Sequence, residues 1–159
     1  MSKTPTISQV SISGSVITLI ILVLLIFAGL LVSSEYGLLI GTSSFLVLRL
    51  LLRLIARDHR KGMMLVRQQQ FNDAVPHFLQ SYEFFDQRRW LDDYRAIFML
   101  SPSAIGYREM ALNNAGFCYS QIGDGANARK YYEQCLALFP ESGVASAALK
   151  MMNSVKERA

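Results

Sequence analysis

The chain has few of the side chains that build catalytic or metal-binding sites. Its 159 residues include two histidines, two cysteines and one tryptophan. His59 and His77 stand far apart, and Cys118 and Cys135 lack a CxxC spacing, so no set of metal ligands clusters along the sequence. Glycine loops for phosphate, zinc-protease helices and nucleophile elbows are also lacking. We expect no enzyme, no metal and no cofactor, with both histidines on the solvated surface and both cysteines in the core of a protein from a reducing compartment.

Charged residues are also scarce, at 18% of the chain, and their excess is confined to one short stretch. Residues 62–159 carry ten basic and ten acidic side chains, so the net charge of +4 comes from residues 49–61, where Asp58 is the only acid. A nucleic-acid-binding protein would spread its basic residues over a folded face, and we therefore expect no nucleic-acid partner. The basic cluster borders a hydrophobic segment instead, and it consists of Arg49, Arg53, Arg57, Arg60 and Lys61.

A long hydrophobic run is present near the start of the chain. Residues 16–32 contain Thr18 as their only side-chain hydrogen-bonding group. As a helix they would be roughly 26 Å long, which is close to the thickness of the hydrocarbon core of a bilayer. We predict a transmembrane helix over 16–34, after a polar segment over 1–15. A cleaved signal peptide is the alternative.

A second hydrophobic run, over 36–56, contains the small residues Gly41, Ser43 and Ser44. If one helix continues through this run, the first three arginines of the basic cluster fall on one side, from which they can reach the lipid headgroups. We predict a second membrane helix that packs closely against the first through its small residues. An amphipathic helix lying in the membrane interface is the alternative. Because the basic cluster follows this run, the positive-inside rule predicts that both chain termini are cytoplasmic.

From residue 57 onward, apolar residues recur at spacings of three and four, which predicts helices throughout. The segment 109–142 resembles the tetratricopeptide repeat, a helix-turn-helix unit of 34 residues. The signature positions of that family are matched in register by Gly116, Tyr119, Ala128, Tyr132 and Pro140. The predicted fold class is therefore all-α: an N-terminal transmembrane helical hairpin followed by a short TPR-like helix-turn-helix repeat domain over 57–159.

A weaker copy of the same pattern lies upstream, over 55–88. Gly62, Ala74 and Phe78 keep the mutual spacing of the glycine, the alanine and the second tyrosine in the later segment. The small residues stand where two antiparallel helices must approach each other, and the aromatic residue fills the space around that contact. The sequence therefore predicts a second, repeat-like helical pair.

Two further helices are predicted around these pairs. Residues 89–103 should form an inserted amphipathic helix, because four apolar residues recur there at helical spacing. Asp92 and Asp93 on this helix are expected to be solvated. A capping helix over 143–156 would cover the open end of the stack. The four apolar residues of the insert are Trp90, Tyr94, Ile97 and Phe98.

The resemblance to the tetratricopeptide repeat implies a module that binds another protein or a peptide. Members of the family mostly bind along the concave face, which is lined by the first helix of each hairpin. For Phe117, internal packing between the helical pairs is the alternative to partner binding. The groove residues that the resemblance implies are Met110, Asn113, Phe117, Ser120 and Gln121.

These features together indicate a membrane-anchored scaffold or recruitment adaptor whose repeat domain faces the cytoplasm, with the lipid bilayer as a second partner. The layout is similar to that of small bacterial inner-membrane proteins that carry such repeats, and a mitochondrial outer-membrane receptor is the alternative. The alternative function is a structural subunit of a multi-subunit membrane complex, with the hairpin packing laterally and the repeat domain bracing the assembly. Self-association into a homo-oligomer and a larger complex both stay open as ways to cover the ends of so short a stack.

Overall fold

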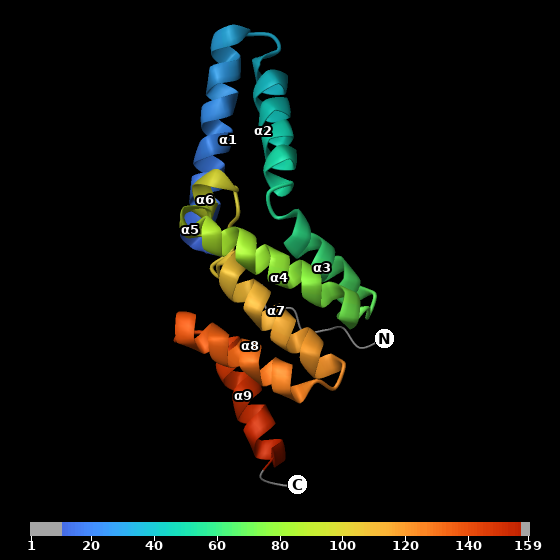
Figure 1. The fold of residues 1–159 in the computed structure, drawn as a ribbon. Helices are drawn as coiled ribbons and strands as arrows, with labels where there is room; N and C mark the ends of the chain where they lie inside the picture. Colours follow the sequence, from blue (N-terminus) through green and yellow to red (C-terminus); the bar gives the residue numbers. More distant parts are fainter. Residues whose placement is uncertain (1–10, 157–159) are drawn as a thin grey trace. The chain divides into compact units, whose positions relative to one another are not determined.

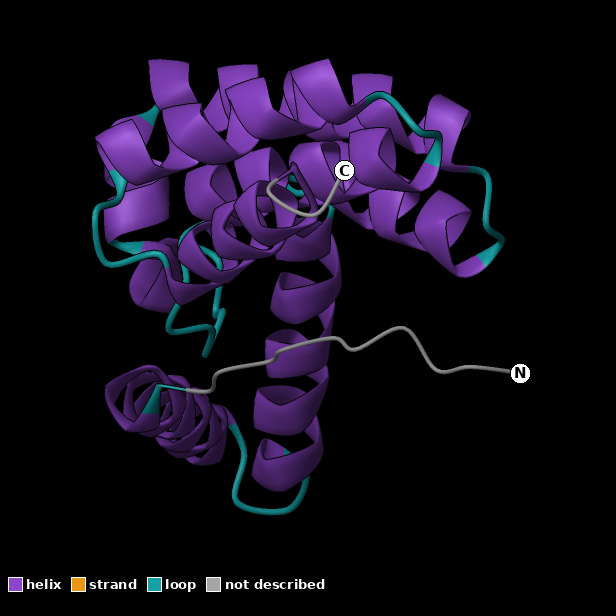
Figure 2. Cartoon of the chain, turned by 90° about the horizontal axis from the view of Figure 1, so that it is seen from below, coloured by secondary structure: helices purple, strands orange, loops and turns teal. Residues whose placement is uncertain are grey.

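The computed structural model describes residues 11–156, and this part of the chain contains nine α-helices. Figure 2 shows helices and loops, with no strand among the described residues. The predicted all-α fold is confirmed. Most of the predicted polar segment 1–15 lies outside the described residues. The helices belong to two compact units, which we call the hairpin unit (described residues 11–57 and 89–106) and the repeat unit (58–88 and 107–156).

The hairpin unit begins with two helices that run side by side in opposite directions, α1 (Ile12–Val32) and α2 (Gly37–Arg53) (Figure 1). The hydroxyl of Ser11 caps α1 by accepting a hydrogen bond from the backbone N–H of Gly14 at 3.3 Å. Among the helices of the described residues, α1 alone is long and apolar enough to cross a membrane by itself. The shorter α2 meets that criterion only when it is taken together with the helix that follows it.

The second helix ends at Arg53 rather than continuing to residue 56. The backbone N–H of Leu54 bonds to the carbonyl of Leu51 at 3.0 Å, so the helix closes in a tighter turn of the 3₁₀ type. The next helix, α3 (Arg57–Arg67), then begins. The prediction that three arginines share one side of a single helix is therefore wrong, because only the first two arginines of the basic cluster lie on α2.

Glycines form the contact between α1 and α2. Gly29, Gly37 and Gly41 are buried there, and a methyl group on Gly29 would overlap the carbonyl oxygen of Gly37. A methyl group on Gly41 would likewise overlap the backbone of α1. The prediction of close packing is confirmed for Gly41. It is wrong for Ser43 and Ser44, which are exposed and lie outside the contact.

The inserted segment forms two short helices where one was predicted over 89–103. They are α5 (Arg89–Asp93) and α6 (Arg95–Phe98), separated by Tyr94. The backbone of Tyr94 leaves the helical region (φ −102°, ψ 28°), which interrupts the helix at that residue. The second of these helices packs beside the start of α1, within the same unit (Figure 1).

The repeat unit is a stack of helices joined by short turns. Besides α3 it contains α4 (Phe71–Gln87), α7 (Tyr107–Gln121), α8 (Gly125–Leu138) and α9 (Gly143–Lys156). The helix α7 lies between α4 and α8, and α9 packs on α8 (Figure 1). Each helical pair thus covers one side of its neighbour, as expected for units that bury their faces against one another.

The pairs α3–α4 and α7–α8 are built around the same contact between a glycine and an aromatic ring. A Cβ atom on Gly62 would lie 2.8 Å from the ring of Phe78, and one on Gly116 would lie 3.0 Å from the ring of Tyr132. The alanine one turn before each ring is completely buried in both pairs. The weaker, upstream copy therefore places its glycine and its ring in the same way as the later one.

The central helix α7 contributes side chains to both hydrophobic cores of the repeat unit. The first core joins α3, α4 and α7, and its buried members are Val66, Ala74, Val75, Phe78, Ala115 and Cys118. The second core joins α7, α8 and α9, and its buried members are Leu112, Ala128, Tyr132, Cys135 and Ala145. Because α7 is packed on two sides, only a narrow part of its surface is left for a partner.

Candidate functional site

The predicted groove residues all lie on α7, but the structure does not bring them to one open surface. Asn113 is only 6% exposed, and its side-chain amide donates a hydrogen bond to the hydroxyl of Ser142 at 3.1 Å. The carbonyl of Ser142 accepts the first backbone hydrogen bond of α9, from Ser146 at 3.1 Å. Asn113 therefore joins α7 to the start of α9. Its prediction as a residue lining an open groove is wrong, because the sequence pattern did not show that the capping helix begins against it.

The other four predicted residues divide into a packed pair and an exposed pair. Met110 and Phe117 are half-buried, and the ring of Phe117 meets the ring of Phe71 edge-on with centroids 5.9 Å apart. That contact is the internal packing role that the sequence left open for Phe117. Ser120 and Gln121 are exposed in the last turn of α7. The accessible part of the predicted groove is therefore the end of this helix.

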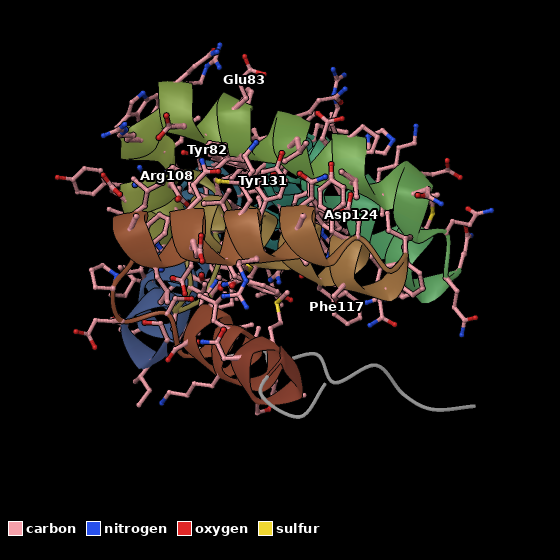
Figure 3. The ribbon with its side chains drawn as sticks, turned by 60° about the horizontal axis from the view of Figure 1, so that its bottom comes forward. Tyr82, Glu83, Arg108, Phe117, Asp124 and Tyr131 are labelled. Atoms are coloured by element: carbon pink, nitrogen blue, oxygen red, sulfur yellow. The ribbon has the colours of Figure 1, made fainter. Side chains whose placement is uncertain are left out.

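A second surface, which the sequence did not single out, lies between α4 and α8. We call it the tyrosine surface: Tyr82, Tyr119 and Tyr131, all half-buried against the second core. The rings of Tyr119 and Tyr131 are stacked, with centroids 5.4 Å apart and planes 4° from parallel. Figure 3 shows Tyr82 and Tyr131 between α4 and α8, whereas Phe117 points out on the other side of α8. Tyrosines are enriched at protein-binding surfaces, because each combines a large apolar ring with a hydroxyl that can form a hydrogen bond.

Charged groups surround the tyrosine surface. The guanidinium of Arg108 lies 3.5 Å from the carboxylate of Asp86 and also over the ring of Phe139, 5.4 Å from its centroid. Asp124 caps α8 by accepting the backbone N–H of Asn127 at 3.0 Å, and this hydrogen bond lowers the pKa of the carboxyl. A partner at this surface would therefore meet tyrosine rings with charges of both signs beside them.

The two histidines have different surroundings. His59 is buried rather than solvated, so that prediction is wrong; its ring packs edge-on against Phe78 and Tyr107, with centroids 5.5 and 5.3 Å away. Desolvation lowers the pKa of His59 to about 4, so the ring is neutral at physiological pH. His77 is half-buried, and its Nδ1 lies 3.7 Å from the carboxylate of Asp58.

The cysteines and the paired aspartates have structural surroundings. Cys118 and Cys135 are completely buried free thiols, as predicted, and burial raises their pKa values to about 12 and about 11. Both thiols are therefore protonated near neutral pH and weakly nucleophilic. Asp92 is buried, at 2% exposed, so its predicted solvation is wrong, whereas Asp93 is exposed. Gly106 leaves the space for the buried carboxylate, since a Cβ atom there would lie 2.8 Å from Oδ2 of Asp92.

Within the described residues, 11–156, no group of three histidine, cysteine, aspartate or glutamate side chains is placed to hold a metal ion. The titratable groups whose pKa values shift markedly do so mainly through burial in the cores. The surface of the repeat unit presents aromatic rings, amides and a few charges, which are groups common in protein interfaces.

Comparison with known proteins assigns the centre of the repeat unit to a family. The family model described as Tetratricopeptide repeat matches residues 110–142, which comprise α7 from its fourth residue on, the turn after it and α8, up to Ser142. This part of the chain is a tetratricopeptide repeat, so the resemblance stated from the sequence is confirmed. Such repeats are protein–protein interaction modules and are typically non-catalytic. The comparisons with curated proteins and with solved structures gave no match.

Proposed function

We propose that this chain is a membrane-anchored adaptor: α1 and α2 insert into a bilayer, and the repeat unit recruits another protein or a peptide. The observation that carries the anchoring is the surface of α1, which buries only Gly14 and Gly29 among its 21 residues. A soluble protein would bury such an apolar helix in its core. The large apolar side chains that α1 leaves exposed include Leu19, Val23, Leu24, Phe27, Leu30 and Leu31.

The dimensions of the hairpin suit a bilayer. A helix of the length of α1 spans about 31 Å, which matches the hydrocarbon thickness. The shorter α2 leaves Leu38, Leu46 and Leu50 exposed and ends at Arg53, whose long side chain can reach the headgroups. The basic cluster follows on the same flank, which favours a cytoplasmic repeat unit and cytoplasmic termini, as in a multi-pass protein of a bacterial inner membrane.

The anchor is tested by expressing the full chain and washing the membrane fraction with alkaline carbonate. Anchoring predicts that the protein stays in the membrane pellet with the intact mass of all 159 residues. A soluble product whose mass lacks the first apolar run would instead establish a cleaved signal peptide. Release of the intact chain by carbonate would contradict the anchor, because a peripheral protein does not resist that wash.

Partner binding is tested by in-cell crosslinking from single positions on the repeat unit. A photo-reactive side chain at Gln121 should capture one discrete protein, because this residue is exposed where the accessible part of α7 ends. The same group at Lys150, exposed on α9, is the matched control and should capture none. Capture from Tyr82 and not from Gln121 would place the partner at the tyrosine surface, to which Tyr82 belongs (Figure 3). An absence of discrete products at Gln121 and Tyr82 would count against an adaptor.

The alternative, a structural subunit of a membrane complex, draws on Ser43 and Ser44. These small residues are exposed on α2 and take no part in the contact with α1, so another membrane helix can pack closely against them. Deleting residues 62–159 separates the two functions. A structural subunit would keep at least part of its membrane complex after the deletion, whereas an adaptor would lose its partner completely.

A further inference from the structure

The inserted segment presents a mainly aromatic surface that neither hydrophobic core of the described residues includes. Its members follow one another along α5, the interrupting tyrosine and α6, and we call them the aromatic patch. The exposed fractions of their side chains are between 46% and 59%. The members are Trp90, Tyr94, Ile97 and Phe98.

The patch belongs to an ordered piece of structure. The ring of Trp90 meets the ring of Phe98 edge-on, with centroids 5.1 Å apart. On the inner side of the same segment, Leu91, Met99 and Leu100 are buried. The insert is therefore amphipathic, with an aliphatic side turned inward and an aromatic side turned outward.

Arg95 holds the two short helices and the following loop together. The three nitrogens of its guanidinium each donate one hydrogen bond to a backbone carbonyl: to Asp92 at 2.8 Å, to Ser103 at 3.0 Å and to Ala104 at 2.6 Å. All three acceptors lie in the insert or directly after it, within the hairpin unit. Because these bonds close the loop back onto α5 and α6, the aromatic side chains keep a defined orientation.

The insert is fastened to the beginning of α1. The backbone N–H of Ser11 donates a hydrogen bond to the carbonyl of Pro102 at 2.6 Å, and a Cβ atom on Gly14 would lie 3.0 Å from Cα of Pro102. The exposed apolar surface of α1 starts at this same end, with Ile12 and Val16. The aromatic patch therefore continues, within one unit, the apolar surface that the proposed function places in the bilayer.

We propose that the aromatic patch lies in the boundary between headgroups and acyl chains of the membrane that α1 and α2 cross. This inference rests on the proposed function. If α1 spans about 31 Å, its first turn lies at one interface, and a segment bonded to that turn lies at the same depth. Tryptophan and tyrosine rings concentrate at that depth in membrane proteins, because one end of each ring is apolar and the other forms hydrogen bonds.

The positive charges near the aromatic patch also favour lipid as what covers it. The two helices of the hairpin are antiparallel, so the end of α1 that holds the insert is also the end at which α2 carries Arg49 and Arg53. Arg53 is exposed and Arg49 is half-buried. A bilayer with anionic headgroups would meet these cations at the depth at which it receives the aromatic rings. The insert thus acts as an interfacial anchor, which fixes the depth of the hairpin at one face of the membrane.

The single tryptophan of the chain makes this inference directly measurable. The full chain is reconstituted into vesicles of phosphatidylcholine and phosphatidylglycerol whose acyl chains carry bromine either near the carbonyl end or near the methyl end. We expect Trp90 to emit at shorter wavelength than it does after unfolding in urea, and to be quenched more strongly by the shallow bromines than by the deep ones. Tryptophan emission that neither lipid quenches would overturn the proposal, and it would show that protein or water covers the patch.

A second chain with its tryptophan on α1 separates failure of this inference from failure of the anchor. In the double variant Trp90→Phe with Leu24→Trp, the tryptophan replaces an exposed side chain in the middle part of α1. If α1 crosses the bilayer, deep bromines quench this tryptophan more strongly than shallow ones. Quenching at Leu24→Trp without quenching at Trp90 would refute the interfacial position of the aromatic patch and leave the membrane insertion of α1 standing. A lack of quenching in both chains would refute the membrane insertion of α1 as well.

Discussion

The hairpin unit and the repeat unit both depend on glycines at helix contacts, but the atoms that the glycines meet are different. In the hairpin unit, Gly29 and Gly41 face the backbone of the neighbouring helix. In the repeat unit, each glycine faces an aromatic ring instead. Gly62 faces the ring of Phe78, and Gly116 faces the ring of Tyr132. A backbone cannot move aside without displacing a whole helix, whereas a ring can shift by a few tenths of an ångström. The same residue type therefore tolerates substitution differently in the two units.

The units also differ in where their large apolar side chains lie. In the hairpin unit the glycines face inward and side chains such as Leu24 and Phe27 face outward. In the repeat unit the large side chains, such as Phe78 and Leu112, are completely buried. Packing in water removes apolar side chains from solvent, whereas helices in a bilayer gain most from close backbone contact between small residues. This difference is what we would expect if only one of the two units is embedded in lipid.

The largest effect should come from removing a ring of the repeat unit. Phe78→Ala deletes a side chain that is completely buried in the first core and leaves a cavity. We expect a loss of about 3–5 kcal/mol in the free energy of unfolding. The measurement is urea unfolding of the full chain in detergent micelles, followed by far-ultraviolet circular dichroism. Leu138→Ala, at an exposed position on α8, is the control and should change the free energy little.

The next largest change in the free energy of unfolding should come from protonation of His59. The folded-state pKa of this buried ring is about 4, against 6.5 for an exposed histidine. The unfolded chain therefore binds a proton that the folded chain does not bind, so stability is fully present above pH 6.5 and decreases as the pH falls toward 4. The decrease should approach about 3 kcal/mol. Urea unfolding at a series of pH values measures it, and in His59→Asn this part of the pH dependence should vanish.

The comparison between the two kinds of glycine is tested directly by matched alanine substitutions. Gly29→Ala brings a methyl group against the carbonyl oxygen of Gly37, so the helices of the hairpin must separate. We expect a loss of about 1–3 kcal/mol, as for other overpacked contacts. The measurement is a titration of the micelles with dodecyl sulfate, followed by the emission of Trp90 in the same unit.

Gly116→Ala should have a smaller effect than the hairpin substitution. The new methyl group meets only the edge of the Tyr132 ring at 3.0 Å. The better helix propensity of alanine, about 1 kcal/mol, offsets the cost of moving that ring. The net change in the free energy of unfolding should therefore lie within about 1 kcal/mol of zero. Equal losses for Gly29→Ala and Gly116→Ala would refute the distinction between backbone-facing and ring-facing glycines.

An effect no larger than about 1 kcal/mol should also come from the cap of α8. Asp124→Ala removes the carboxylate that accepts the backbone N–H of Asn127. Loss of such a cap costs about 1 kcal/mol of the free energy of unfolding. Asp124→Asn preserves an accepting oxygen and is the matched variant. Urea unfolding should show a larger loss for the alanine variant than for the asparagine variant, and equal losses would argue that the charge rather than the accepting oxygen matters here.

Much of the fold follows from spacing along the chain, and the candidate site follows only in part. The distance between a glycine and an aromatic residue was the same in both helical pairs, and both pairs form the same contact. Spacing could not show that Asn113 lies against the residue that caps α9, because that contact joins residues 29 positions apart. It could not show the break at Tyr94 or the burial of His59 either, since both depend on tertiary surroundings.

The sequence by itself determined the helical class, the tetratricopeptide repeat over 110–142, and the apolar helix near the start of the chain, α1, that is long enough to cross a bilayer. These are local properties, set by the period of apolar residues and by small residues at fixed spacing. Only the tertiary structure decided which side chains stay exposed once the helices have packed. It enclosed Asn113, left Ser120 and Gln121 at the end of α7, and bonded the insert with its aromatic patch to the start of α1. Exposure depends on contacts between distant segments, and a linear pattern does not contain them.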